Sequence, residues 1–245
     1  MAKATVFCSW DDAPHLSKAQ KELMLAAVPP WQRDSRSKGI PQLGSGAVYT
    51  VPESEFVVTP VPIESHWHRC FALDVGWKIN AALFGALDRD TGTLYIYDEV
   101  YKGKCEPAIV AAAIQKRGEW IPGVIDPASR GRGQKDGEQL IRIYMDLGLD
   151  IRPAKNAVEA GLLKVWEMLS QGQIKVFNTC QNFLAEYRLY RRDKNGNIVK
   201  ANDHAMDALR YMVMSGLDRA ITQPKTGSNG KNWYDWEPRH FEFIG

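Results

Sequence analysis

The chain has 245 residues, enough for one enzyme-sized domain with an appended segment or for two small domains. It carries 31 lysine and arginine residues against 29 aspartate and glutamate residues, so only a local basic patch could meet a nucleic acid. The 44% hydrophobic and 24% charged content excludes disordered, collagen-like and disulfide-scaffold proteins. Neither a membrane-span run of about 18 apolar residues nor a signal peptide is found, so we expect a cytosolic protein without a membrane partner.

The first 65 residues differ in composition from the rest of the chain. Ser17 and Gln20 have the spacing of a capping box, which predicts one short helix that ends before Pro29 and Pro30. Residues 39–51 are rich in glycine and proline and read as loop. Because this segment has few apolar positions, we expect residues 1–65 to be an attachment to a main domain over residues 66–218.

The main domain is predicted to open with three antiparallel strands, over residues 70–75, 79–87 and 93–101. Helices are then expected over 107–117, 134–147, 158–170, 181–189 and 203–217, with strands over 120–125, 150–153 and 174–177. Strands that alternate with helices add parallel neighbours to a sheet. The predicted fold class is α/β, a mixed sheet flanked by helices, and residues 219–245 read as a flexible tail.

Acidic residues occupy unusual positions in this pattern. Asp74 ends an apolar strand, where an ionised carboxylate needs a compensating cation or donor. Asp126 ends a second apolar strand, at the edge where open α/β sheets place ligands. Asp207 lies in the last predicted helix, with Asp203 four residues and His204 three residues before it on the same face.

Two interpretations of these carboxylates stay open. Each could be structural, bonded to backbone amides, and Asp203 could be a helix N-cap. Jointly they suit an oxygen-only site for Mg²⁺ or Mn²⁺, in which two ions clamp the attacking and leaving oxygens of a phosphodiester. His204 could then ligate a metal or carry a proton, or it could orient Asp207 by a hydrogen bond. Glu99 is either a further ligand at one remove or an edge residue.

Two basic clusters flank the predicted site and favour contacts to phosphates, which position DNA without reading its sequence. The alternative is that they are solvated charged loops. The first cluster follows Asp126 and the second surrounds a predicted hairpin before the last helix; their members are Arg130, Arg132 and Lys135, and Arg188, Arg191, Arg192, Lys194 and Lys200.

Three stretches together resemble the C-terminal nuclease domain of tailed-phage terminase large subunits, over about residues 66–218. They are residues 73–76 (LDVG), 124–128 (VIDPA) and 200–211 (KANDHAMDALRY). The resemblance implies an RNase H-like fold, with Asp74, Asp126 and Asp207 at the metal-binding positions and Asp203 and His204 at accessory ones. It also implies a metal-dependent endonuclease that cuts double-stranded viral DNA during genome packaging, by headful cleavage with little sequence specificity.

The resemblance extends to residues 10–16 (WDDAPHL) and 33–41 (RDSRSKGIP), which are similar to the segment that links the family's ATPase motor to its nuclease. Residues 1–65 are therefore expected to be the end of such a motor and a linker. No phosphate-binding loop of the form GxxxxGK[ST] is found, so no ATPase activity is expected. The family's partners would be the portal protein and the terminase small subunit, in the host cytoplasm.

Two rival functions are weighed against this one. A resolvase or transposase could use the same kind of sheet and would prefer branched DNA or transposon ends. A non-catalytic module could instead dock the packaging motor on the portal, since Trp233 and Trp236 in the tail have the character of interface anchors.

Overall fold

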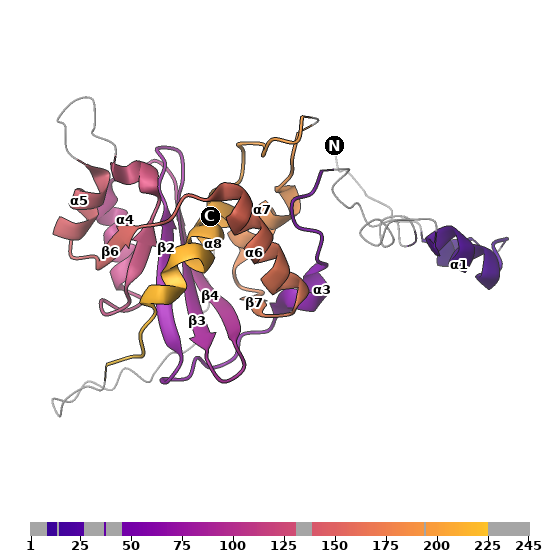
Figure 1. Ribbon diagram of the computed structural model, residues 1–245, viewed down its shortest axis with the longest axis horizontal. Coiled ribbons are helices and arrows are strands. Elements are labelled where there is room, and N and C mark those ends of the chain that lie inside the picture. Colours follow the sequence, from indigo (N-terminus) through magenta and orange to yellow (C-terminus); the bar gives the residue numbers. More distant parts are fainter. Residues whose placement is uncertain are drawn as a thin grey trace, which may run out of the picture.

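The computed structural model describes residues 9–13, 15–26, 37, 46–130, 139–193 and 195–224. Within them, one seven-stranded sheet has the order β1-β7-β4-β3-β2-β5-β6. Strands β2, β3 and β4 are antiparallel, and the remaining neighbours pair in parallel. Helices cover both faces of this sheet (Figure 1). The mixed α/β sheet predicted from the sequence is confirmed.

The strands and α-helices of the described residues range from two to thirteen residues in length. The strands are β1 (Val57–Val58), β2 (His68–Asp74), β3 (Asn80–Asp88), β4 (Thr93–Lys102), β5 (Gly123–Ile125), β6 (Ile151–Pro153) and β7 (Ile174–Phe177). The α-helices are α1 (Lys18–Ala26), α3 (Glu53–Phe56), α4 (Pro107–Gln115), α5 (Leu140–Asp146), α6 (Val158–Ser170), α7 (Gln181–Leu189) and α8 (His204–Tyr211). Of the described helices, none has the length and apolar character needed to cross a membrane.

The sequence patterns predicted most of these elements. The three-stranded meander and helices α6 and α7 lie where they were expected. The capping box of α1 is present, since the Ser17 amide donates to the Gln20 side chain and the Gln20 amide donates back to Ser17 Oγ. The last helix is shorter than predicted, because after Tyr211 the chain continues as a π-helical turn over Met212–Gly216. Residues 131–138, which include the start of the helix predicted over 134–147, and the tail tryptophans lie outside the described residues.

The alternation of side chains along β2 separates two cores. Cys70 and Ala72 face one core, which contains residues of α6, α7 and α8. Phe71 and Leu73 face the other, which contains residues of α4 and α5. Because successive side chains of a strand point to opposite faces, Asp74 belongs to the same face as Cys70 and Ala72. This places its carboxylate on the side of the sheet that α8 covers.

The domain begins earlier than the predicted boundary at residue 66. Residues 46–65 contribute Tyr49, Val51 and Phe56 to the core of the α8 face, and Phe56 is 0% exposed. Strand β1 adds an edge to the sheet by pairing in parallel with β7. The prediction missed this because a two-residue strand and three scattered apolar side chains leave no periodic signal.

Helix α8 is fixed to the rest of the domain by a buried glutamate. Glu186 of α7 accepts hydrogen bonds from the backbone amide of Ala205 (2.5 Å) and from the hydroxyl of Tyr101 in β4 (2.6 Å). It therefore satisfies one of the unpaired amides at the start of α8 and ties that helix to the sheet. Asp203 occupies the N-cap position without a side-chain capping bond, so Glu186 performs the capping.

We expect Phe56→Ala to lower the free energy of unfolding by about 3–5 kcal/mol, as for other buried aromatic truncations. Val61→Ala is the matched control on the same segment, since Val61 is exposed, and its effect should stay within about 0.5 kcal/mol. Urea denaturation of both variants measures the difference. Equal stabilities would show that residues 46–65 do not pack on the domain.

A second prediction concerns the glutamate that caps α8. Glu186→Ala should cost about 1–3 kcal/mol, because the Ala205 amide and the Tyr101 hydroxyl lose a buried acceptor. Glu186→Gln should cost less, since its amide oxygen can still accept the Ala205 bond. Glu167→Ala, at an exposed position of α6, serves as the control in thermal denaturation. A neutral Glu186→Ala would refute the capping role.

Candidate active site

Two of the predicted carboxylates end neighbouring parallel strands. Leu73 of β2 pairs with Ile125 of β5, so Asp74 and Asp126 follow at equivalent positions. The Asp126 amide continues the pairing by donating to the Leu73 carbonyl (2.9 Å). Adjacent strands lie about 4.8 Å apart, so the two carboxylates emerge side by side at this edge of the sheet.

Helix α8 brings the other predicted residues to the same place. It packs on β2 and β3, with Asp203 at its N-cap, His204 at its first position and Asp207 one turn further on. Asp203 and Asp207 share a face, since both carboxylates lie within 3.5 Å of the Lys200 ammonium. Helix α8 lies against β2 (Figure 1). The five residues predicted for the site are thus gathered where α8 meets the ends of β2 and β5.

Asp74 is the most strongly perturbed of these carboxylates. Burial raises its pKa to about 6; the His204 hydrogen bond opposes the rise, and the negative charges of Asp207 and Asp126 add to it. His204 Nδ1 lies 2.9 Å from Asp74 Oδ2, and this bond raises the pKa of His204. The suggestion that His204 orients Asp207 is therefore corrected, because its partner is Asp74. Asp74 and His204 thus form a hydrogen-bonded pair in which each group raises or lowers the pKa of the other toward its charged form.

Asp126 is held by neutral donors. Its Oδ1 accepts from the Ala128 amide at 2.9 Å and from the Tyr211 hydroxyl of α8 at 3.1 Å. Burial raises the pKa of Tyr211, so its hydroxyl stays protonated and donates. Asp126 is therefore oriented toward α8 while its second oxygen keeps capacity for another partner.

Asp207 is paired with two cations. Arg210, only 1% exposed, donates from Nη2 to Oδ1 at 2.9 Å, and Lys200 Nζ lies 3.5 Å from Oδ2. The aliphatic stem of Arg210 passes over Gly161 of α6, where a Cβ atom would lie 2.6 Å from Arg210 Cγ. The sequence pattern did not predict this arginine partner, which neutralises the Oδ1 side of Asp207.

The donor set suits a hard divalent cation. Carboxylate oxygens are the ligands that Mg²⁺ and Mn²⁺ prefer, and the raised pKa of Asp74 reflects negative charge crowded into a buried place. No three acidic, histidine or cysteine side chains of the described part already stand in metal-ligand arrangement. His204, Arg210 and Lys200 each occupy a carboxylate oxygen of the site.

The predicted basic clusters divide into paired and exposed members. Arg188 forms a bidentate ion pair with Glu53, and Arg192 forms one with Glu159. Arg191 is exposed, and Lys200 faces Asp203 and Asp207. Only the backbone of Arg130 is described, while Arg132, Lys135 and Lys194 lie outside the described residues.

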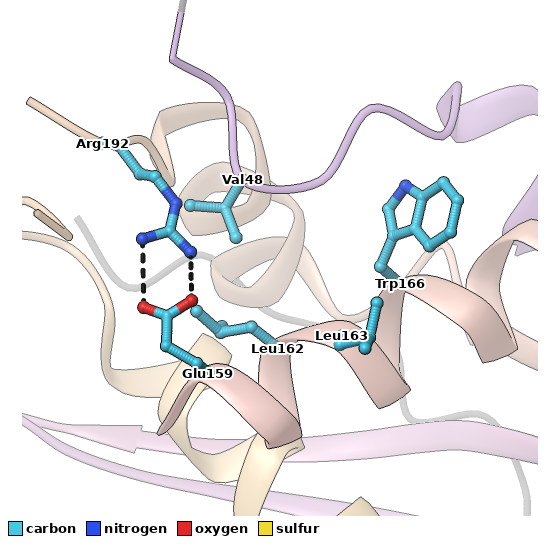
Figure 2. A pocket seen from close by; sticks show the side chains of 6 residues that line it. All are labelled: Val48, Glu159, Leu162, Leu163, Trp166 and Arg192. Carbon is cyan, nitrogen blue, oxygen red and sulfur yellow. Dashed lines mark hydrogen bonds and ion pairs between the residues drawn. The ribbon is translucent and has the colours of Figure 1, made fainter. Parts of the chain in front are cut away.

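A pocket of about 310 Å³ lies beside the Arg192 pair and away from the carboxylates. Figure 2 shows the guanidinium of Arg192 facing Glu159 at one end and the indole of Trp166 at the other. Its wall comes from α6, from the segment before α3 and from the segment after α7; the lining residues are Val48, Glu159, Leu162, Leu163, Trp166 and Arg192. With none of the predicted ligands in its wall, this pocket is not the candidate site.

Three residues around the site were not predicted from the sequence, and the structure decides the role of a fourth. Glu186, Arg210 and Tyr211 hold α8 or its carboxylates in place. Each of the three is a polar residue within the apolar stripe of its helix, and this feature of the sequence could have identified it. Glu99 accepts bonds from the amides of Asn182 and Phe183 at the start of α7, so it caps that helix from an interior strand and is not the edge or turn residue considered.

Most of the main domain matches a known protein family. The family model described as "Terminase RNaseH-like domain" matches residues 72–215. The chain is 34% identical to the terminase large subunit of Salmonella phage P22 over 227 residues, 87% of this chain and 45% of the relative. It therefore spans less than half the length of that relative.

Solved structures agree with the family match. The P22 large terminase nuclease domain superposes with a TM-score of 0.67 and 31% identity, covering 73% of this chain and 96% of that one. The large terminase nuclease from thermophilic phage G20c, crystallised with bound magnesium, shares the fold at a TM-score of 0.53 and 18% identity, covering 71% and 99%. By this family match, the chain belongs to the terminase RNaseH-like domain family.

Proposed function

We propose that this chain is a Mg²⁺- or Mn²⁺-dependent endonuclease that cuts double-stranded DNA with little sequence specificity during viral genome packaging. The observation that carries the proposal is the convergence of Asp74, Asp126 and Asp207 at the ends of β2 and β5 beneath α8. Membership of the terminase family and the G20c relative crystallised with magnesium support it.

Asp74, Asp126 and Asp207 are the proposed ligands, with Asp203 beside them. Two bound divalent ions would supply an activated water and neutralise the charge of the departing 3′ oxygen. Lys200 is the partner that has to give way, because it is exposed and sits between Asp203 and Asp207. His204, hydrogen-bonded to Asp74 through Nδ1, is placed to hold or move a proton at its other ring nitrogen.

The wider setting is proposed from the relatives. Large terminase subunits of phages imply work on viral DNA in the host cytoplasm, with the portal protein and the terminase small subunit as partners. We propose headful cleavage as the reaction, since phosphate contacts by basic residues would hold any sequence. Branched DNA and transposon ends, the substrates of a resolvase or transposase, should show no advantage over linear duplex.

The metal site is tested by Asp126→Asn, which should lose Mn²⁺-dependent plasmid nicking and keep its fold. Thermal denaturation gives a second readout, because an ion that binds only the folded chain raises Tm with its concentration. We expect the parent and the exposed-site control Asp218→Asn to be stabilised by Mn²⁺, and Asp126→Asn to be stabilised much less. Unchanged nicking and Mn²⁺ stabilisation in Asp126→Asn would reject the assignment.

The basic hairpin is tested by comparing arginines that differ in their partners. Arg191→Gln should weaken duplex binding and reduce the salt slope by about 0.9, the value for one phosphate that is no longer neutralised. Arg188→Gln should change both much less, because its guanidinium is already paired with Glu53. Fluorescence anisotropy across a salt series measures the slopes. Identical slopes in the parent and Arg191→Gln would remove the hairpin from the DNA surface.

A further inference from the structure

The turn between β2 and β3 carries the most exposed large hydrophobic side chain of the described residues. Trp77 is 84% exposed and follows Asp74 by three residues. Burying an indole of this size normally contributes to stability, and here it points into solvent. The exposure lies beside the candidate active site, and none of the packing described above uses this side chain.

The turn is held close to the carboxylates. Three residues of chain span at most about 11 Å, so the Trp77 backbone lies within that distance of Asp74. A Cβ atom at Gly76 would lie 3.7 Å from His204 Cε1, which is ordinary van der Waals contact, so the turn lies next to the first residue of α8. A duplex bound at the carboxylates would therefore pass close to this turn.

Three lysines lie on this turn and on the segment next to it. Lys78 is exposed on the same turn, and Lys102 and Lys104 are exposed at and just beyond the end of β4. The two segments touch, since a Cβ atom at Gly103 would lie 2.8 Å from the Lys78 carbonyl oxygen. The Asn80 side chain also donates to the Lys102 carbonyl at 3.5 Å. One exposed tryptophan and three exposed lysines thus lie on two adjoining segments next to the candidate site.

We propose that Trp77 with Lys78, Lys102 and Lys104 forms a DNA-contacting site, in which the indole stacks on or inserts between bases next to the cut and the lysines hold phosphates. The inference rests on the proposed function, because it places duplex DNA at the carboxylates. Aromatic rings interleaved with cations are the common means of holding nucleic acid without reading sequence. At 3.4 Å per nucleotide, 11 Å corresponds to about three base-pair steps from the cut.

Charge also favours this partner. The carboxylates of Asp74, Asp126 and Asp207 repel a phosphate backbone, and the three lysines supply attraction on the adjacent rim. An indole inserted into a duplex locally unstacks base pairs and bends the DNA. That distortion would expose the phosphodiester to the carboxylates without any preference for a base sequence.

The test is duplex binding by the whole 245-residue chain in EDTA, where no cutting occurs, measured by anisotropy with a fluorescent oligonucleotide. Trp77→Ala should bind about tenfold more weakly, the effect of removing one base stack. Its salt slope should match the parent's, because an uncharged side chain releases no counterions. Trp166→Ala, which removes a partly exposed indole from α6, is the matched control and should bind within about twofold of the parent.

Two further variants separate stacking from charge. Trp77→Phe should recover most of the affinity, because a phenyl ring also stacks. Replacing Lys78, Lys102 and Lys104 by glutamine should lower the salt slope by about 0.9 for each phosphate that the lysines neutralise. Melting curves of each variant check that the fold is intact, which is expected since Trp77 is almost fully exposed.

Several results would overturn the inference. A parent that does not bind duplex, a Trp77→Ala that binds like the parent, or a Trp77→Phe no better than Trp77→Ala each contradicts it; the second result would leave the indole to a protein partner. Its failure is distinguishable from that of the proposed function. If Trp77→Ala binds and nicks like the parent, only the inference fails, whereas Mn²⁺ nicking by Asp126→Asn alongside Trp77-dependent binding refutes only the metal site.

Discussion

Burial of the Asp74 carboxylate at the end of β2 is the constraint on which the candidate site depends. Asp74 emerges on the α8 face, close enough to Asp126 and Asp207 for their charges to raise its pKa further. Such a group is costly to bury unless cations or donors meet it. Helix α8 supplies them, because it carries both His204 and Arg210, and its position depends on the cap that Glu186 provides.

The partners of the carboxylates differ in how easily they can be exchanged. Arg210 is buried and anchored, so it stays with Asp207. Lys200 is largely exposed and has a flexible stem, so its ammonium can leave the space between Asp203 and Asp207 at little cost. A removable charge therefore lies between the acidic residues, as the proposed binding of a divalent ion would require.

The sequence predicted those helices and strands whose apolar residues follow a regular spacing. The apolar runs of β2 and β7 and the amphipathic pattern of α6 specified these elements, whereas the face of the sheet from which Asp74 emerges became clear only from the two cores. Contacts between distant segments carry no such periodicity. The pairing of Arg210 with Asp207 is local in sequence, yet its burial depends on α6, and the packing of Phe56 depends on β7 and α7. Only the three-dimensional arrangement of these segments reveals such contacts.

Gly161 has no side chain, and this affects helix α8 as well as its own helix, α6. Arg210 can lie flat across this helix only because Gly161 offers bare backbone there, so even a methyl group would push the guanidinium away from its carboxylate. A residue without any functional group thus governs the electrostatics of a reaction centre on another helix. Natural variation in this fold should be narrow at that position, even though nothing bound by the protein would ever touch it.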